Sequence, residues 1–153
     1  MSPAVSELPF SDTLRVRFSD TDAQGHLYFA NYLVYADEVA GFYMEDLGFS
    51  AMNPLDAPCF IFTVNLSCRY IDECKAFATV RVFVGYSRLG NSSADIRFEL
   101  YNDSTGAQLA EGSFTQVFTD KTTRKSTPVP AAFRSAIVAR QPELLTPASC
   151  DGA

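Results

Sequence analysis

An apolar stretch in the first third of the chain predicts one long helix, and this helix limits the folds that the chain can adopt. Between Phe29 and Leu47, apolar residues recur at steps of three and four, which places them on one side of a helix. A helix of this length would measure about 28 Å. Further apolar residues widen that side well beyond a narrow stripe, so the helix must be covered from several directions. Gly48 is a candidate C-terminal cap.

Five other segments alternate apolar and polar residues, which is typical of β-strands. One of them precedes the helix and four follow it. Turn-forming residues at 87–91 and 102–106 separate the last three, which favours tight antiparallel hairpins. The five predicted strands are 13–18, 60–70, 78–86, 94–100 and 110–118.

The order of these elements predicts an α+β fold. One long helix and one sheet can bury each other only if the sheet curls around the helix. We predict a single domain over residues 11–140, which includes a short helix at 131–139, after an N-terminal arm of residues 1–10. The tail, residues 141–153, carries no core pattern and is predicted to be disordered. Long edge strands and an apolar outer face favour a dimer at least.

Composition excludes several classes of function. The net charge of -6 is unfavourable for a protein that wraps nucleic acid. No apolar run reaches the roughly 18 residues that a membrane span requires. The N-terminus has neither the basic nor the apolar region of a secretion signal. Four cysteines with one histidine favour free thiols in a reducing cytoplasm over disulfides or a zinc site. The cysteines are Cys59, Cys68, Cys74 and Cys150.

The turn between the first strand and the helix carries the candidate chemistry. Asp20 and Asp22 lie among residues that favour turns, and Gly25 can adopt a positive φ. The Asp-x-Asp pattern also occurs in phosphoryl-transfer phosphatases. That class needs a larger doubly wound fold with a magnesium site, whereas the second half of this chain consists of strands. Asp20 is interpreted as a structural residue of the turn.

The segment FSDTDAQGHLYFANY, residues 18–32, closely resembles the signature of the hotdog-fold thioesterases in the 4-hydroxybenzoyl-CoA thioesterase-like family. A second, weaker match is SRLGNSS at residues 87–93. The resemblance implies a long central helix wrapped by a curled five-stranded antiparallel sheet. It also implies hydrolysis of an acyl-CoA or acyl carrier protein thioester to free acid and thiol.

The resemblance further implies the roles of several residues. Asp22 takes the position of the catalytic carboxylate, which is either a nucleophile or a general base. The backbone N–H of Phe29 takes the position of the oxyanion donor, as suits a helix N-terminus. Gly25 and His26 complete the catalytic turn. His26 either orients substrate or Asp22, or only packs and caps the turn. The resemblance implies no metal ion and no cofactor apart from the CoA of the substrate.

Six more residues are candidates for substrate binding, and each has a simpler alternative. Asn31 can instead cap the start of the helix, and Thr63 can lie on a solvated face of its strand. Arg88 can be an ordinary surface arginine in a hairpin turn. These candidates are Asn31, Tyr32, Thr63, Arg88, Ser92 and Ser93.

The sequence departs from the family pattern at two places. Some relatives have a histidine at the position of Phe29. The segment Asp72–Phe77 replaces a Pro-Ala-Arg motif, which puts the register of that loop in doubt. The main alternative function is a non-catalytic hotdog module that binds acyl groups. A dehydratase of the same fold would need a histidine and a helical acid that do not match here. We expect a homodimer or a homotetramer of hotdog dimers, located in the cytoplasm.

Overall fold

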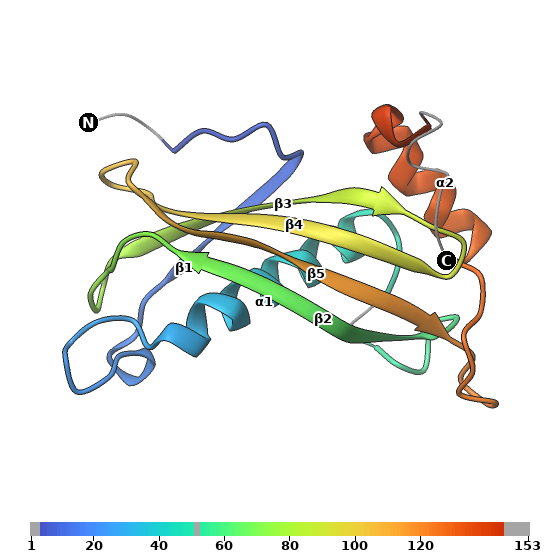
Figure 1. Cartoon of the computed structure of the whole chain (residues 1–153), viewed down its shortest axis with the longest axis horizontal. Coiled ribbons are helices and arrows are strands. Elements are labelled where there is room, and N and C mark those ends of the chain that lie inside the picture. The colour runs from blue at the N-terminus through green and yellow to red at the C-terminus, as the bar shows by residue number, and fades with distance from the viewer. Residues whose placement is uncertain (1–3, 51–52, 146–153) are drawn as a thin grey trace. The chain divides into compact units, whose positions relative to one another are not determined.

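The computed structural model describes residues 4–50 and 53–145 (Figure 1). The start of the expected arm, most of the expected tail and Cys150 therefore lie outside the described residues. No helix among the described residues is long and apolar enough to cross a membrane.

Five antiparallel strands form one open sheet, as the sequence predicted (Figure 1). The sheet has the order β1-β3-β4-β5-β2, so β1 and β2 are its edge strands. A long helix, α1, connects β1 to β2, and a short helix, α2, follows β5. The elements are β1 Phe10–Arg15, α1 Phe29–Asp46, β2 Phe60–Tyr70, β3 Thr79–Leu89, β4 Ser93–Asn102, β5 Gln108–Thr119 and α2 Ala131–Arg140.

The described residues group into two compact units, and each unit takes parts of several strands and a part of α1. The first unit contains the start of α1 with β1 and the loop between them, and the second contains the end of α1 with α2. The first is drawn from the ranges Met1–Ala40, Ser67–Gly85 and Phe98–Gly112, and the second from Gly41–Leu66, Tyr86–Arg97 and Ser113–Ala153.

The first unit has an aliphatic and aromatic core. The strands β1 and β3 pair in an antiparallel register from Phe10 opposite Val84 to Arg15 opposite Thr79. A Cβ on Gly85 would overlap the ring of Pro9, so the end of the expected arm packs closely on β3. The largest fully buried side chains of this unit are Val16, Val39, Val80, Val82, Val84, Phe98, Leu100 and Leu109.

The second unit has an aromatic core that includes the end of the short helix. Phe133 of α2 packs against the rings of Phe49, Tyr86 and Phe118. Gln141, which follows α2, is buried and accepts hydrogen bonds from the Tyr43 hydroxyl and the Tyr86 N–H at 3.0 and 2.8 Å.

Three local expectations from the sequence are wrong. The first strand ends at Arg15, and Phe18 is 77% exposed in a short 3-10 turn, because Asp20 folds back onto Arg17. Strand β3 continues through residues 87–89, so Arg88 lies on a strand and not in the hairpin turn.

The third wrong expectation concerns the tail. Its first residues, Gln141–Leu145, are part of the ordered structure, and they include the 3-10 helix Pro142–Leu145. Gln141 and Leu144 are both buried, because they close the core beneath α2. The remainder of the expected tail lies outside the described residues.

Candidate active site

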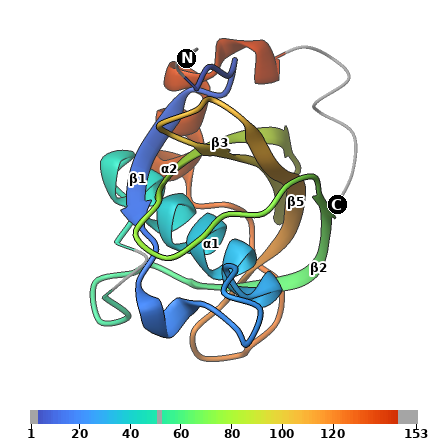
Figure 2. The same ribbon diagram turned by 90° about the vertical axis from the view of Figure 1, so that its left-hand side faces the viewer.

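The loop between β1 and α1 holds Asp22 in a tight turn. Figure 2 views the ribbon from the end where this loop enters α1. The N–H of Asp22 donates to the carbonyl of His26 at 2.9 Å, and the N–H of Gly25 donates to the carbonyl of Asp22 at 3.0 Å. Gly25 has a φ of +80°, which glycine adopts without strain. Within the described residues, the Asp22 carboxylate accepts one hydrogen bond, from the Gln24 N–H at 2.9 Å, and the residue is exposed.

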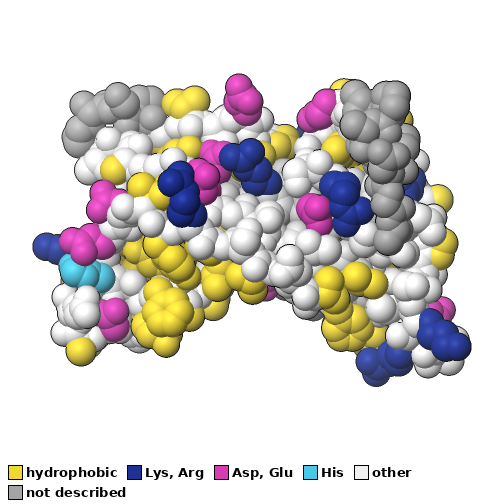
Figure 3. All heavy atoms as spheres, viewed as in Figure 1, with side chains coloured by type: hydrophobic (Ala, Val, Ile, Leu, Met, Phe, Trp, Pro, Cys, Tyr) yellow, Lys and Arg dark blue, Asp and Glu magenta, His cyan; other side chains and the backbone are white. Residues whose placement is uncertain are grey.

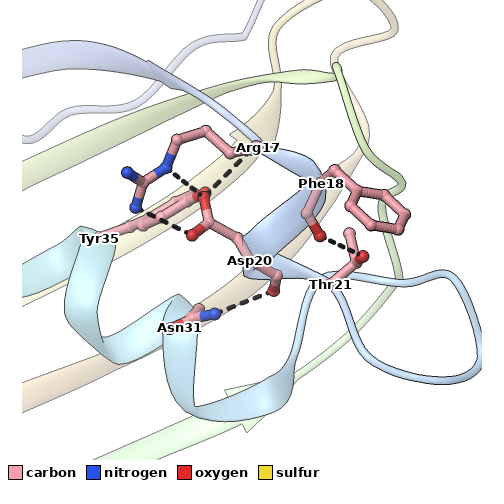
Figure 4. A network of polar contacts seen from close by, with 6 residues as sticks. All are labelled: Arg17, Phe18, Asp20, Thr21, Asn31 and Tyr35. Atoms are coloured by element: carbon pink, nitrogen blue, oxygen red, sulfur yellow. Dashed lines mark hydrogen bonds and ion pairs between the residues drawn. The ribbon is translucent and has the colours of Figure 1, made fainter.

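Asp20 belongs to the same loop, and Figure 4 shows it among Arg17, Tyr35 and Asn31. Its buried carboxylate accepts hydrogen bonds from the Arg17 guanidinium at 3.0 and 3.2 Å and from the Tyr35 hydroxyl at 2.7 Å. Burial alone would raise the pKa of Asp20, but the hydrogen bonds from Arg17 and Tyr35 outweigh it and lower that pKa. The carbonyl of Asp20 accepts the Asn31 amide at 2.9 Å. Asp20 is therefore structural, as the sequence indicated.

The first turn of α1 faces the same loop. The N–H of Tyr28 donates to the carbonyl of Asp20 at 3.0 Å, which fixes where the helix begins. Within the described part of the chain, the N–H of Phe29 has no hydrogen-bond partner, as expected for the first residue of a helix. The Tyr70 hydroxyl of β2 donates to the carbonyl of Phe29 at 2.9 Å. An unpaired N–H at the positive end of a helix dipole can stabilise an oxyanion.

The segment that follows β2 forms the opposite wall. The N–H of Leu27 donates to the carbonyl of Cys74 at 2.8 Å, and His26 Nε2 lies 3.2 Å from a carboxylate oxygen of Glu73. The Tyr32 hydroxyl donates to the carbonyl of Asp72 at 3.2 Å. Burial raises the pKa of the Cys74 thiol to about 11, so this cysteine is protonated at neutral pH and is a poor nucleophile.

These groups surround an open pocket of about 410 Å³. Asp22, Phe29 and Tyr70 line it together with His26, Tyr32, Asp72 and Glu73. The side of the pocket formed by Phe29 and Tyr70 is aromatic, and both rings are partly exposed. Figure 3 shows that hydrophobic side chains gather along β2 on the viewed face. The pocket thus combines an exposed carboxylate, an unpaired N–H and an aromatic wall.

The structure brings together most of the predicted catalytic turn. Asp22, His26, Phe29 and Tyr32 line the pocket, and Gly25 shapes the loop that carries Asp22. Asn31 donates its amide to the loop backbone, so it holds the helix start.

The other substrate-binding candidates belong to the second unit and do not line this pocket. Thr63 is exposed on β2. The Arg88 guanidinium is engaged with Asp95 at 2.9 Å and with the Ser93 hydroxyl at 2.9 Å. The carbonyl of Ser92 accepts the Phe118 N–H at 2.9 Å. A role of these residues in substrate binding stays a prediction.

Sequence reasoning missed Tyr70, Asp72 and Glu73 as pocket residues. Tyr70 was interpreted only as a strand residue, and the acidic pair only as a departure from the family motif. Their position in the sequence could have indicated this role. Tyr70 ends the longest predicted strand, and Asp72 and Glu73 directly follow it, where the sheet meets the start of the helix.

Comparison with known proteins identifies the family. The model of the thioesterase-like superfamily matches residues 16–137, so the chain belongs to that superfamily. A candidate esterase from Aquifex aeolicus strain VF5 is 33% identical over 63 residues, which are 41% of this chain and 49% of that protein. The chain thus spans about half the length of the curated relative that it matches.

Solved structures show the same fold. A 1,4-dihydroxy-2-naphthoyl-CoA thioesterase from Synechocystis superposes with a TM-score of 0.77 at 19% identity, covering 84% of this chain and 94% of that one. A candidate thioesterase from Pseudomonas aeruginosa superposes with a TM-score of 0.75 at 28% identity, covering 86% and 99% of the two chains. The chain has the hotdog fold, as the motif at residues 18–32 predicted.

Proposed function

We propose that this protein hydrolyses the thioester of an acyl-CoA, or of an acyl carrier protein, to free acid and thiol. The observation that carries the proposal is that the Asp22 carboxylate and the unpaired Phe29 N–H line one pocket. Membership of the thioesterase-like superfamily supports thioester chemistry at this pocket. CoA enters only as part of the substrate, and the proposed chemistry uses no metal ion or cofactor.

The proposed reaction uses these two groups at the thioester carbonyl. The carbonyl oxygen accepts the Phe29 N–H, and the helix dipole stabilises the negative charge that develops on that oxygen. Asp22 either attacks the carbonyl carbon directly or takes a proton from an attacking water. In both routes the C–S bond breaks, the thiol leaves with a proton, and water supplies the hydroxyl of the acid.

We also propose that the working form contains at least two copies joined through β2. This edge strand is exposed on both faces over residues 62–67, and Phe62, Val64 and Leu66 are between 45% and 60% exposed. An edge of this length with exposed apolar side chains can pair with a second copy. Because Tyr70 ends β2 and lines the pocket, such pairing would place the pocket beside the interface. Assembly into a tetramer and a cytoplasmic location stay predictions.

A thiol-release assay tests the proposed reaction. The purified protein is offered short, long and aromatic acyl-CoAs, followed by acyl carrier protein thioesters, and free thiol is followed with a chromogenic reagent. We expect turnover of at least one class of thioester. Binding of acyl-CoA without hydrolysis of any thioester would instead favour the non-catalytic module, and it would overturn the proposed function.

A further inference from the structure

Tyr70 is the last residue of β2, and its side chain reaches the start of α1 within the first unit. Its hydroxyl donates to the carbonyl of Phe29 at 2.9 Å. Its ring packs edge-on against the rings of Phe29 and Tyr32, with 6.3 and 5.2 Å between ring centres. Tyr32 is itself buried, and its hydroxyl donates to the carbonyl of Asp72 just beyond β2. The side chain of Tyr70 is therefore held both at its ring and at its hydroxyl.

The two peptide groups that flank the Cα of Phe29 are both held through their carbonyl oxygens. The peptide before it contains the carbonyl of Tyr28, which accepts the N–H of Asn31 at 2.8 Å. The peptide after it contains the carbonyl of Phe29, which accepts the Tyr70 hydroxyl. The Phe29 N–H belongs to the first of these peptides and, among residues 4–50 and 53–145, makes no hydrogen bond. Because a peptide group is planar, holding both carbonyls limits the directions in which this N–H can point.

The Tyr70 hydroxyl has one proton to donate. Burial raises the pKa of Tyr70 above its ordinary value of 10.0, so the hydroxyl keeps its proton at neutral pH. A neutral tyrosine hydroxyl is a single donor. While that donor is bonded to the carbonyl of Phe29, it is not available to the carbonyl oxygen of a bound thioester. The hydroxyl is thus suited to support the backbone and leaves the contact with the oxyanion to the Phe29 N–H.

We propose that Tyr70 is a positioning residue, whose hydroxyl holds the first turn of α1 so that the Phe29 N–H is directed at the thioester carbonyl. This inference rests on the proposed thioesterase function. A donor that is already aligned stabilises the developing negative charge without having to reorganise in the transition state. Without the hydroxyl bond, the first turn is held less firmly and the N–H is directed away from the oxyanion for part of the time. The loss therefore falls on the chemical step more than on substrate binding.

Steady-state kinetics of Tyr70→Phe test the proposal, because this variant removes the hydroxyl and keeps the ring. Wild type and variant are compared on the acyl-CoA that wild type hydrolyses fastest. We expect kcat to fall about tenfold to a hundredfold, because small misplacements of a catalytic group have effects of this size. The KM should change by less than about threefold, because the hydroxyl does not contact the substrate. A role in substrate binding would instead raise the KM.

Tyr101→Phe is the matched control. The Tyr101 hydroxyl donates to a carboxylate oxygen of Glu99 at 2.7 Å, and its ring packs edge-on against Phe83. All three residues belong to the same unit as Tyr70, but none of them lines the pocket. This variant loses an equivalent hydroxyl bond and should keep the kcat and KM of wild type.

A rescue variant separates the hydrogen bond from the packing of the ring. Tyr70→4-aminophenylalanine returns an N–H donor to the same end of the ring, and it should recover most of the kcat that Tyr70→Phe loses. A kcat as low as that of Tyr70→Phe would show that the hydroxyl does not act as a donor, and it would overturn the inference.

An NMR measurement tests the positioning step without requiring turnover. The order parameter of the Phe29 amide reports how firmly the direction of its N–H is held. It should fall from about 0.85 toward about 0.6 in Tyr70→Phe and stay unchanged in Tyr101→Phe. The remaining amide signals show that each variant keeps its fold.

The two measurements distinguish failure of this inference from failure of the proposed function. An unchanged Phe29 amide in Tyr70→Phe, or a kcat within about threefold of wild type, would overturn the role of Tyr70. A wild-type protein that hydrolyses no thioester, with a Phe29 amide that loosens in Tyr70→Phe, would overturn the proposed function and support the positioning of this N–H by Tyr70.

Discussion

The Tyr35 hydroxyl donates a 2.7 Å hydrogen bond to the buried carboxylate of Asp20, and this bond joins the second turn of α1 to the loop that carries Asp22. The same carboxylate binds Arg17, so one buried charge joins the start of the loop that follows β1 to the helix. The position of the candidate catalytic loop therefore depends on Asp20, which has no direct part in the proposed chemistry.

Tyr35→Phe should destabilise the protein by about 1.5–3 kcal/mol, because it removes a hydrogen bond to a buried charged group. Urea unfolding measures the change. Tyr28→Phe is the matched control, since Tyr28 is 43% exposed, and it should change stability by less than about 0.5 kcal/mol. Equal stability of the two variants would contradict a supporting role for Tyr35.

The Asp20 network also predicts how stability depends on pH. The folded state lowers the pKa of Asp20 below its ordinary value of 3.8, so the ionised form contributes stability above that pH. This contribution disappears as the pH falls through the lower pKa of the folded state. The difference in unfolding free energy between wild type and Asp20→Asn should therefore be constant above about pH 5 and shrink below about pH 4. A difference that persists unchanged to pH 2 would rule out this linkage.

Gly112→Ala should strongly destabilise the sheet. A Cβ there would overlap the carbonyl oxygen of Ser67 on β2 and lie 2.6 Å from the Phe98 ring. We expect a loss of about 3 kcal/mol or more in thermal or urea unfolding. Gly25→Ala is a useful contrast, since apart from its chain neighbours no described atom would lie within 4 Å of a Cβ added there, and only the positive φ is unfavourable. Its cost should be about 1–2 kcal/mol. The reverse order of the two losses would refute this packing.

Gln141→Leu should destabilise the second unit by about 2–4 kcal/mol. Its amide satisfies both the N–H and the carbonyl of buried Tyr86, at 2.8 Å each, and leucine would leave both without these bonds. The control is Gln108→Leu, since Gln108 makes one 3.3 Å contact with Glu111. Stability equal to that of wild type would mean that the chain after α2 does not close the core.

The sequence predicted those parts of the fold in which burial of one side of a helix or strand produces a regular spacing of apolar residues. The spacing of apolar residues marked the start of α1 at Phe29, because burial on one side of a helix requires that spacing. The end of β1 was misplaced because the turn at Arg17 is fixed by a hydrogen bond to Asp20, which apolar alternation does not reveal. The expected tail includes Gln141, because one buried polar residue does not produce a periodic pattern in the sequence.

The candidate site was predictable only where its residues are close in sequence. The motif predicted Asp22, Gly25, His26 and Phe29 as site residues because all four lie in one loop or at the start of the helix that follows it. Tyr70 reaches the carbonyl of Phe29 across 41 positions, and only the pairing of strands in the sheet brings it there. Arg88 is a substrate-binding candidate in the sequence, but the sequence does not reveal its pairing with Asp95, because that pairing depends on the register of β3 and β4.

The most direct test of the account compares thioester hydrolysis by wild type, Asp22→Asn and Asp12→Asn. Asparagine at position 22 keeps an oxygen for the Gln24 N–H, so the loop should keep its shape. Asp12 likewise accepts the N–H of a neighbouring residue, at 2.7 Å, but lies on β1 and does not line the pocket. We predict that Asp22→Asn lowers kcat by about a hundredfold to ten-thousandfold with unchanged stability, while Asp12→Asn retains full activity. Turnover by Asp22→Asn within a few-fold of wild type would contradict a catalytic role for Asp22.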